Sequence, residues 1–282
     1  MTDILIAFAN LVRAGRAEIS DFSESHNRAN QMGYGFESYI KDLFCNSFSR
    51  NAQEKLEIYS RNFSWSGNNS NPPDLMIWGG DAVEMKKIES ANAGLALNSS
   101  HPKHKLFAND PKISTAIRQA ENWVEKDIIY AIGSIAKNSR GLNSLWFVYG
   151  DCYAASREIY ENLANRISDA SARAENVEFS ESNELAHVNR VDPLGITYLR
   201  VRGMWGIEHP SRVFDYIPET RDKFANLILR DEKYFSFPEN DRREIENLRG
   251  ENFAIFNIWI KNPDNPAQLI SAKLLSLKRK NE

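Results

Sequence analysis

Residues 73–88 read PDLMIWGGDAVEMKKI, and this stretch predicts the centre of the fold. Two short apolar runs, residues 74–78 and 82–88, are separated by Gly79 and Gly80, a pattern typical of a β-hairpin. Side chains alternate between the two faces of a strand, so Glu84 and Lys86 point to the same face. The hairpin therefore carries a carboxylate and an ammonium group side by side.

The register of this hairpin determines which residue faces Glu84. A strict two-residue turn at Gly79 and Gly80 places Leu75 opposite Glu84 and turns Asp74 away. A three-residue loop or a bulge shifts the register by one residue and brings Asp74 onto the face of Glu84. We predict such an irregularity, because the chemistry that these side chains suit needs both carboxylates together.

Two carboxylates and an adjacent lysine suit the hydrolysis of a phosphodiester. Asp74 and Glu84 offer the oxygen ligands that Mg²⁺ prefers, and a bound Mg²⁺ polarises the phosphate and helps to generate hydroxide. Lys86 is placed to orient or deprotonate the water and to offset charge in the transition state. Lys87 lies on the other strand face, which suits a structural role or a phosphate contact. The alternative is a surface hairpin with ordinary solvated charges.

Helices and strands alternate along the rest of the chain. Apolar periodicity predicts helices over residues 2–18, from Tyr34 to Phe44, and over 114–123 and 154–167, with strands at 127–132, 145–149, 196–202 and 253–260. We therefore expect an α/β or α+β protein with a central mixed sheet flanked by helices. Glu37 sits at the border of the buried face of its helix, which makes it a further catalytic candidate or a simple surface charge.

The composition predicts one large folded domain. The chain of 282 residues is 42% hydrophobic and 26% charged, so it can bury a substantial core in a single domain, 1–282, or in a domain with an appended lobe. Its apolar runs are far shorter than the ~20 residues that a bilayer span needs. The first residues lack the features of a secretory signal, and Cys45 and Cys152 offer no disulfide framework, so we expect a cytoplasmic protein.

The net charge of −3 argues against a protein that coats nucleic acid through bulk attraction, so any DNA binding must be local. One candidate is a Pro-interrupted loop with hydroxyl, amide and basic side chains that suit phosphate contacts: Asn98, Ser99, Ser100, Lys103 and Lys105. The alternative is a solvated basic loop. His101 and His104 have no cysteine or carboxylate partners nearby in sequence, so a zinc site is not expected.

A second candidate lies in the expected strand 196–202, where Tyr198, Arg200 and Arg202 alternate onto one face. Arginine is the side chain that best matches the O6 and N7 acceptors of guanine. We expect Arg200 and Arg202 to read guanines, or else to form internal salt bridges with Asp192 or Glu208. A DNA-recognition lobe within residues 185–282 follows from the first alternative.

The Pro-Asp and Glu-x-Lys pair on a glycine-linked hairpin resembles the PD-(D/E)XK nuclease superfamily. Six further strings resemble the NgoPII-type type II restriction endonucleases: residues 27–30 (NRAN), 71–74 (NPPD), 86–90 (KKIES), 97–100 (LNSS), 188–194 (VNRVDPL) and 202–206 (RGMWG). These strings span most of the chain.

The resemblance implies a Mg²⁺-dependent homodimer that cleaves double-stranded DNA at the palindrome GGCC, together with a cognate DNA methyltransferase in the same host. A relaxed or related GC-rich site is also compatible with it. Two other functions remain open at this point. The first is a repair or recombination nuclease that recognises DNA structure, and the second is a non-catalytic DNA-binding protein.

Overall fold

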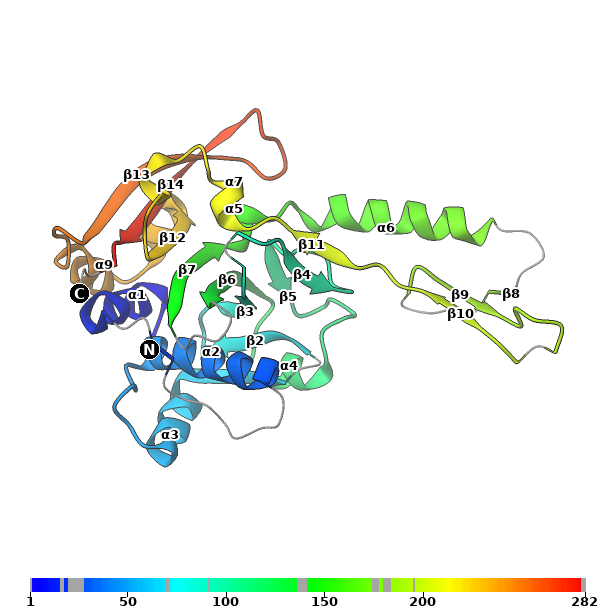
Figure 1. Ribbon diagram of the computed structural model, residues 1–282, viewed down its shortest axis with the longest axis horizontal. Helices are drawn as coiled ribbons and strands as arrows, with labels where there is room; N and C mark the ends of the chain where they lie inside the picture. The colour runs from blue at the N-terminus through cyan, green and yellow to red at the C-terminus, as the bar shows by residue number, and fades with distance from the viewer. Residues whose placement is uncertain are drawn as a thin grey trace.

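A computed structural model describes residues 2–15, 18–19, 28–68, 71–90, 92–135, 141–173, 178–179, 184–194 and 196–279. A nine-stranded sheet forms its centre (Figure 1). In spatial order its strands are β1 (Phe63–Asn68), β2 (Asn71–Ile77), β3 (Ala82–Ile88), β6 (Glu125–Ile135), β7 (Leu142–Tyr149), β12 (Ala225–Arg230), β14 (Leu269–Leu277) and β13 (Phe253–Lys261), with β5 (Lys105–Phe107) beside β6. The pairs β3–β6 and β7–β12 are parallel and the other pairs are antiparallel, so the predicted mixed sheet is confirmed.

Helices surround this sheet, as an α/β protein requires. They are α1 (Ile4–Ala14), α2 (Arg28–Cys45), α3 (Ala52–Asn62), α4 (Thr115–Gln119), α5 (Gly150–Tyr153), α6 (Arg157–Ala172), α7 (Pro210–Val213), the 3₁₀ turn η1 (Pro218–Thr220), α8 (Asp231–Ser236) and α9 (Glu239–Glu246). Within the described ranges, no helix combines the length and apolar content needed to cross a membrane.

Two predicted helices are shorter than expected because local caps end them. The first, predicted over residues 2–18, ends at Ala14, where Gly15 adopts a φ of 55° and its N–H bonds to the carbonyl of Leu11. The helix predicted over 114–123 stops at Gln119, and the Trp123 indole donates back to the carbonyl of Ile117. The predicted helix over 154–167 is displaced and covers Arg157–Ala172.

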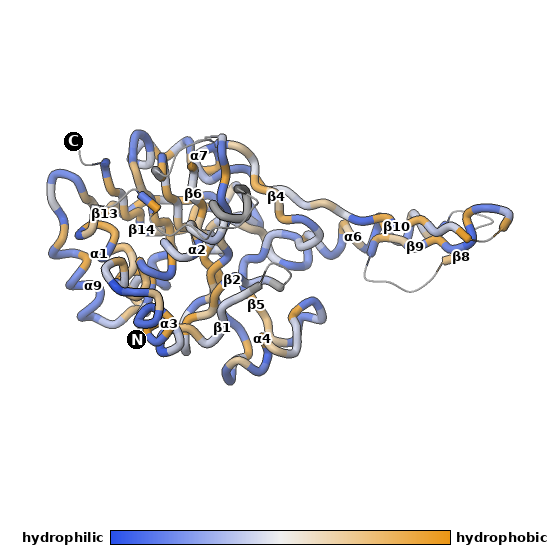
Figure 2. The backbone as a smooth tube through the Cα atoms, turned by 60° about the horizontal axis from the view of Figure 1, so that its bottom comes forward, coloured by the Kyte–Doolittle hydropathy of each residue, from blue (hydrophilic) through white to orange (hydrophobic). Residues whose placement is uncertain are grey.

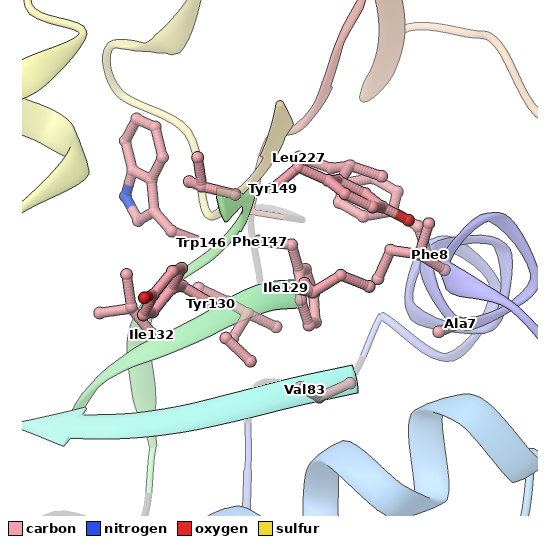
Figure 3. Packing of buried hydrophobic residues seen from close by; sticks show 14 of the residues in the cluster. Ala7, Phe8, Val83, Ile129, Tyr130, Ile132, Trp146, Phe147, Tyr149 and Leu227 are labelled. Atoms are coloured by element: carbon pink, nitrogen blue, oxygen red, sulfur yellow. The ribbon is translucent and has the colours of Figure 1, made fainter. Parts of the chain in front are cut away.

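The core lies on both faces of the sheet. Phe8 of α1 packs edge-on against Phe147 of β7 at 6.4 Å between ring centroids, and it also contacts Phe253 of β13. Tyr130 of β6 and Trp146 of β7 point to the face of the sheet opposite to that of Phe147, because neighbouring residues of a strand alternate between the faces (Figure 3). This two-sided burial explains why residues 128–132 and 145–149 read as continuous apolar runs.

An arm projects from this body and comprises the described residues 157–173, 178–179, 184–194 and 196–202 (Figures 1 and 2). It consists of α6 and a small sheet of β8 (Glu178–Phe179), β9 (Ala186–Asn189) and β10 (Leu199–Val201). At its root, β11 (Trp205–Ile207) pairs with β4 (Leu95–Asn98). The predicted strand 196–202 is thus only Leu199–Val201, and the span 185–282 divides between this arm and the central sheet, which it rejoins as β12, β13 and β14.

Candidate active site

The β2–β3 hairpin has the predicted irregular register. Leu75 pairs with Val83, and the Ile77 N–H bonds to the Asp81 carbonyl at 3.0 Å, which leaves a three-residue loop at residues 78–80. Gly79 enables this loop, because its φ of 60° lies in the left-handed region that disfavours other residues. Counting on from these pairs places Asp74 opposite Glu84. The prediction that these two residues share one face is confirmed.

The side chains of the hairpin form a compact polar group. Asp74 Oδ2 accepts a hydrogen bond from the Met85 backbone N–H at 2.6 Å. This N–H therefore bonds to a side chain instead of to the backbone of a neighbouring strand. Lys86 Nζ lies 2.7 Å from Glu84 Oε1. Burial, and then the charge of Glu84, raises the pKa of Asp74 to about 7. The three residues predicted from the motif are therefore together in space.

The second carboxylate oxygen of Glu84, Oε2, bears on whether this site can bind a metal ion. Oε2 is buried and has no hydrogen-bond partner among the described residues. A buried anionic oxygen without a partner is costly, and a cation would relieve that cost. No group of three or more His, Cys, Asp or Glu side chains is arranged for a metal within the described ranges. Mg²⁺ needs fewer, since it commonly takes one or two carboxylates and completes its shell with water and substrate phosphate.

Helix α2 brings Glu37 and Lys41 to the same group. These residues are one turn apart and share a helix face. Glu37 contributes to the raised pKa of Asp74, and burial raises the pKa of Glu37 itself. Burial also lowers the pKa of Lys41, against the charges of Glu37 and Asp74. Glu37 therefore lies near Asp74 as predicted, whereas Lys41 was missed; its position four residues after Glu37 was the available signal.

A buried network attaches α2 to α3. The carboxylate of Asp42 accepts hydrogen bonds from Lys55 at 2.8 Å, Tyr59 at 2.7 Å and Ser47 at 2.5 Å. Buried polar groups that are satisfied in this way hold their elements in one relative position. Asp42 follows Lys41 directly, so the network also holds the helix face that Glu37 and Lys41 occupy.

The loop after β4 passes beside Glu84. Its two lysines were expected to contact phosphate, but each is paired with a carboxylate. Lys103 is buried and pairs with Asp110 at 2.8 Å. Lys105 pairs with Glu125 at 2.8 Å. The phosphate contact predicted for Lys103 is therefore not supported by its position, because its ammonium is shielded and paired. Asn98, Ser99 and Ser100 lie at the start of this loop, and Ser100 and Glu84 line one small cavity.

Arg200 and Arg202 both bind the carboxylate of Glu184, a partner that the sequence did not reveal. Arg200 contacts Glu184 through Nε at 2.8 Å and Nη2 at 2.7 Å, and Arg202 Nε contacts the same carboxylate at 2.5 Å. The salt bridges weighed from sequence named the wrong partners. Asp192 instead accepts N–H groups of its own turn, and Glu208 pairs with Arg212. The intervening residues between Glu184 and β10 hide this pairing from any local pattern.

These arginines line a groove of about 970 Å³ between α6 and the β9–β10 pair. Ser99 and His101 line its inner end, so the loop that passes Glu84 also reaches the groove. His101 stacks on Tyr160 of α6 at 5.2 Å between ring centroids. The arm groove and the hairpin carboxylates are thus connected by one loop.

The mixed sheet with flanking helices is an α/β architecture consistent with a restriction-endonuclease-like core. The chain belongs to the NgoPII restriction endonuclease family, whose model matches residues 2–261. It is 45% identical over 277 residues to the type II restriction enzyme NgoPII of Neisseria gonorrhoeae, an alignment that covers 97% of this chain and 99% of that one. No solved structure matches the chain.

Proposed function

We propose that this member of the family is a type II restriction endonuclease of the PD-(D/E)XK kind, which hydrolyses both strands of duplex DNA at GGCC. The observation that carries the nuclease assignment is the register of the hairpin, which puts Asp74 and Glu84 on one face beside Lys86. The GGCC site rests on the family resemblance alone. Cutting two strands of a palindrome needs two active sites, so the enzyme works as a homodimer.

In this proposal Asp74 and Glu84 hold Mg²⁺. When bound, the ion supplies Lewis-acid chemistry to the scissile phosphate and its water. Asp74 keeps one carboxylate oxygen on the Met85 N–H, which fixes its direction. Lys86 neutralises Glu84 in the structure, and it presents its protons to the attacking water and its charge to the phosphate. Glu37 and Lys41 border the same group and tune its charge.

In this proposal the arm groove recognises the DNA sequence. Arg200 and Arg202 present guanidinium groups to guanine O6 and N7, while Glu184 holds both arginines from one side. Arg202 is bound through Nε, which leaves its terminal nitrogens for a bidentate contact, whereas Arg200 gives Nε and Nη2 to Glu184 and keeps Nη1 and the second N–H of Nη2 for a base. Asn98, Ser99 and Ser100 contact the DNA backbone between this groove and the hairpin, whereas Lys105 lies on β5 and is paired with Glu125.

The assignment is tested by incubating the full chain with long duplex DNA and Mg²⁺, and by resolving the products on a gel. Discrete bands that map to GGCC support it, and discrete bands at another sequence correct the site. A smear or structure-dependent nicking would instead indicate a repair or recombination nuclease. A mobility shift without cleavage would indicate a non-catalytic DNA-binding protein. Protection of the DNA by methylation of the cut site tests the implied methyltransferase partner.

A further inference from the structure

Helix α6 carries its large apolar side chains on the face that is exposed to solvent. It runs for 16 residues without one buried residue. Ile159, Leu163 and Ile167 follow each other at intervals of four, so they form one stripe along the helix. They are 47%, 49% and 41% exposed. A surface helix normally turns such a stripe toward its own core.

The other side of α6 is the polar one, and it faces the protein. Glu161, Ala164 and Ser168 line the arm groove. Tyr160 anchors the start of the helix through its stacking on His101 and its edge contact with Trp205. The packing of Tyr160 in the first turn therefore fixes which face of α6 points toward the protein. The apolar stripe is left on the outer surface, where a contiguous apolar patch marks an interaction site.

We propose that this stripe, Ile159, Leu163 and Ile167, is where a second copy of the chain docks. The proposal rests on the proposed function, which requires two active sites for two strands. An antiparallel pairing of two α6 helices about a twofold axis at Leu163 places Ile159 opposite the partner subunit's Ile167, and the reverse. One apolar stripe is thus complementary to itself.

The charges of α6 favour a copy of this chain over DNA as the occupant of the stripe. Residues 157–173 contain no lysine, three arginines and three carboxylates, so the helix has no net positive charge to attract phosphates, whereas Arg200 and Arg202 lie across the groove on the β10 side. Along α6 the first half carries Arg157, Glu158 and Glu161, a net charge of −1, and the second half carries Arg166 and Asp169, which with the C-cap Arg173 gives a net charge of +1. Antiparallel pairing sets the first half of one helix against the second half and cap of the other, and it opposes the two helix dipoles.

The size of the stripe predicts a weak dimer that DNA strengthens. Three half-exposed side chains on each helix bury far less than the ~1,200 Å² of a stable specific interface. Two protomers held on one palindrome have a high effective concentration, so the same contact is occupied on DNA. Free protein should therefore be a mixture of monomer and dimer, whereas protein on its site should be a dimer.

The experiment measures the stoichiometry of the full chain by analytical ultracentrifugation, free and on a duplex that carries its cleavage site, with Ca²⁺ in place of Mg²⁺. We expect two chains per duplex for the unaltered protein, and at least about a tenfold weaker self-association for Leu163→Glu, since a buried leucine contributes ~1.5–3 kcal/mol. Leu56→Glu is the matched control: Leu56 is exposed on α3, and its substitution should leave the stoichiometry unchanged.

A second variant tests the geometry independently of any loss of folding. Leu163→Cys places two thiols at the twofold axis, so oxidation by air and copper should give a covalent dimer, whereas Leu56→Cys should not. One chain per duplex for the unaltered protein, or a Leu163→Glu variant that still dimerises fully, would overturn the docking site. A Leu163→Glu variant that loses DNA affinity at unchanged stoichiometry would overturn it in favour of DNA. If DNA is never cleaved but the dimer depends on Leu163, the proposed function fails and the interface stands.

Discussion

The hairpin that carries Asp74, Glu84 and Lys86 and the arm that carries Arg200 and Arg202 are built in opposite ways. The hairpin lies inside the central sheet, and burial there raises the pKa of Asp74 to about 7. The arm projects from the body (Figure 2), and Arg200 and Arg202 keep 47% and 55% of their side chains exposed. One region shields its charges from water, and the other keeps them accessible.

This difference matches the two tasks of a site-specific nuclease. Stabilising a charged transition state benefits from a low dielectric and fixed groups, which a buried sheet provides. Reading bases requires side chains that reach into a groove of DNA, so they must stand away from the body. Substitutions in the hairpin should therefore affect the rate on every DNA, whereas substitutions in the arm should affect the choice of DNA.

The largest effect is expected for Lys86→Ala. Losing a preorganised positive charge in the site should lower kcat by about 10³-fold, by analogy with the ~10²–10³ lost with one oxyanion donor. Cleavage kinetics under single turnover measure the loss, and binding to the site without Mg²⁺ should persist. Lys87→Ala is the matched control, because Lys87 lies on the other strand face and pairs with Glu89. Full cleavage by Lys86→Ala would refute the proposed role of Lys86.

A smaller and selective effect is expected for Arg200→Ala and Arg202→Ala. Each loss of a bidentate base contact should cost about 1–3 kcal/mol, or roughly 5- to 150-fold in kcat/KM on the cognate site. Cleavage at sites with a substituted guanine should change much less. Arg212→Ala is the control, since Arg212 is exposed and paired outside the groove. Equal losses on cognate and substituted sites would mean that the arm does not read bases.

The raised pKa of Asp74 predicts a pH dependence of metal binding. Protonated Asp74 cannot bind Mg²⁺, so below its pKa of about 7 the apparent affinity for Mg²⁺ should fall by about tenfold per pH unit, and above it the affinity should level off. Stability without metal changes in the opposite direction. The free energy of unfolding falls as the pH rises from about 3.8 to about 7, because the unfolded chain ionises Asp74 in this range while the folded chain keeps it protonated. Calorimetric Mg²⁺ titrations from pH 5.5 to 8.5 measure the first effect, and Asp74→Asn should abolish it.

Glu184→Gln tests whether the arm is preorganised. Removing the charge that holds both arginines should weaken the cognate preference by about threefold to tenfold, since a hydrogen bond between charged groups contributes ~1.5–3 kcal/mol and part of it persists with the amide. The ratio of kcat/KM on cognate and substituted sites is the measurement. Glu208→Gln serves as the control in an exposed pair. An unchanged ratio would limit Glu184 to the folding of the arm.

The smallest effect concerns the register itself. Gly79→Ala forces a side chain into the left-handed region and should cost about 1–2 kcal/mol of stability, seen as a Tm lowered by roughly 2–4 °C. Gly33→Ala makes the same change inside α2, where helix propensity favours alanine and the Tm should not fall. A Gly79→Ala protein with unchanged Tm would show that the loop tolerates another conformation.

The sequence by itself determined the parts that follow local periodicity. Strand alternation put Glu84 and Lys86 together, and the need for Asp74 on their face predicted a three-residue loop or a bulge, of which the structure has the loop. Helical spacing placed Glu37 at the border of its helix, and runs of apolar residues marked the central strands. These features depend on residues within one or two turns of each other, so a pattern can reveal them.

Only the tertiary structure decided which charged groups meet. Lys103 reads as a phosphate-binding lysine, but folding buries it against Asp110. Glu184 carries no motif, yet it holds Arg200, 16 residues away. The outward stripe of α6 has the same spacing as a core-facing one, and only its packing shows which way it points. The physical reason is that a side chain's partners depend on burial and on contacts distant in sequence, which neither residue type nor spacing encodes.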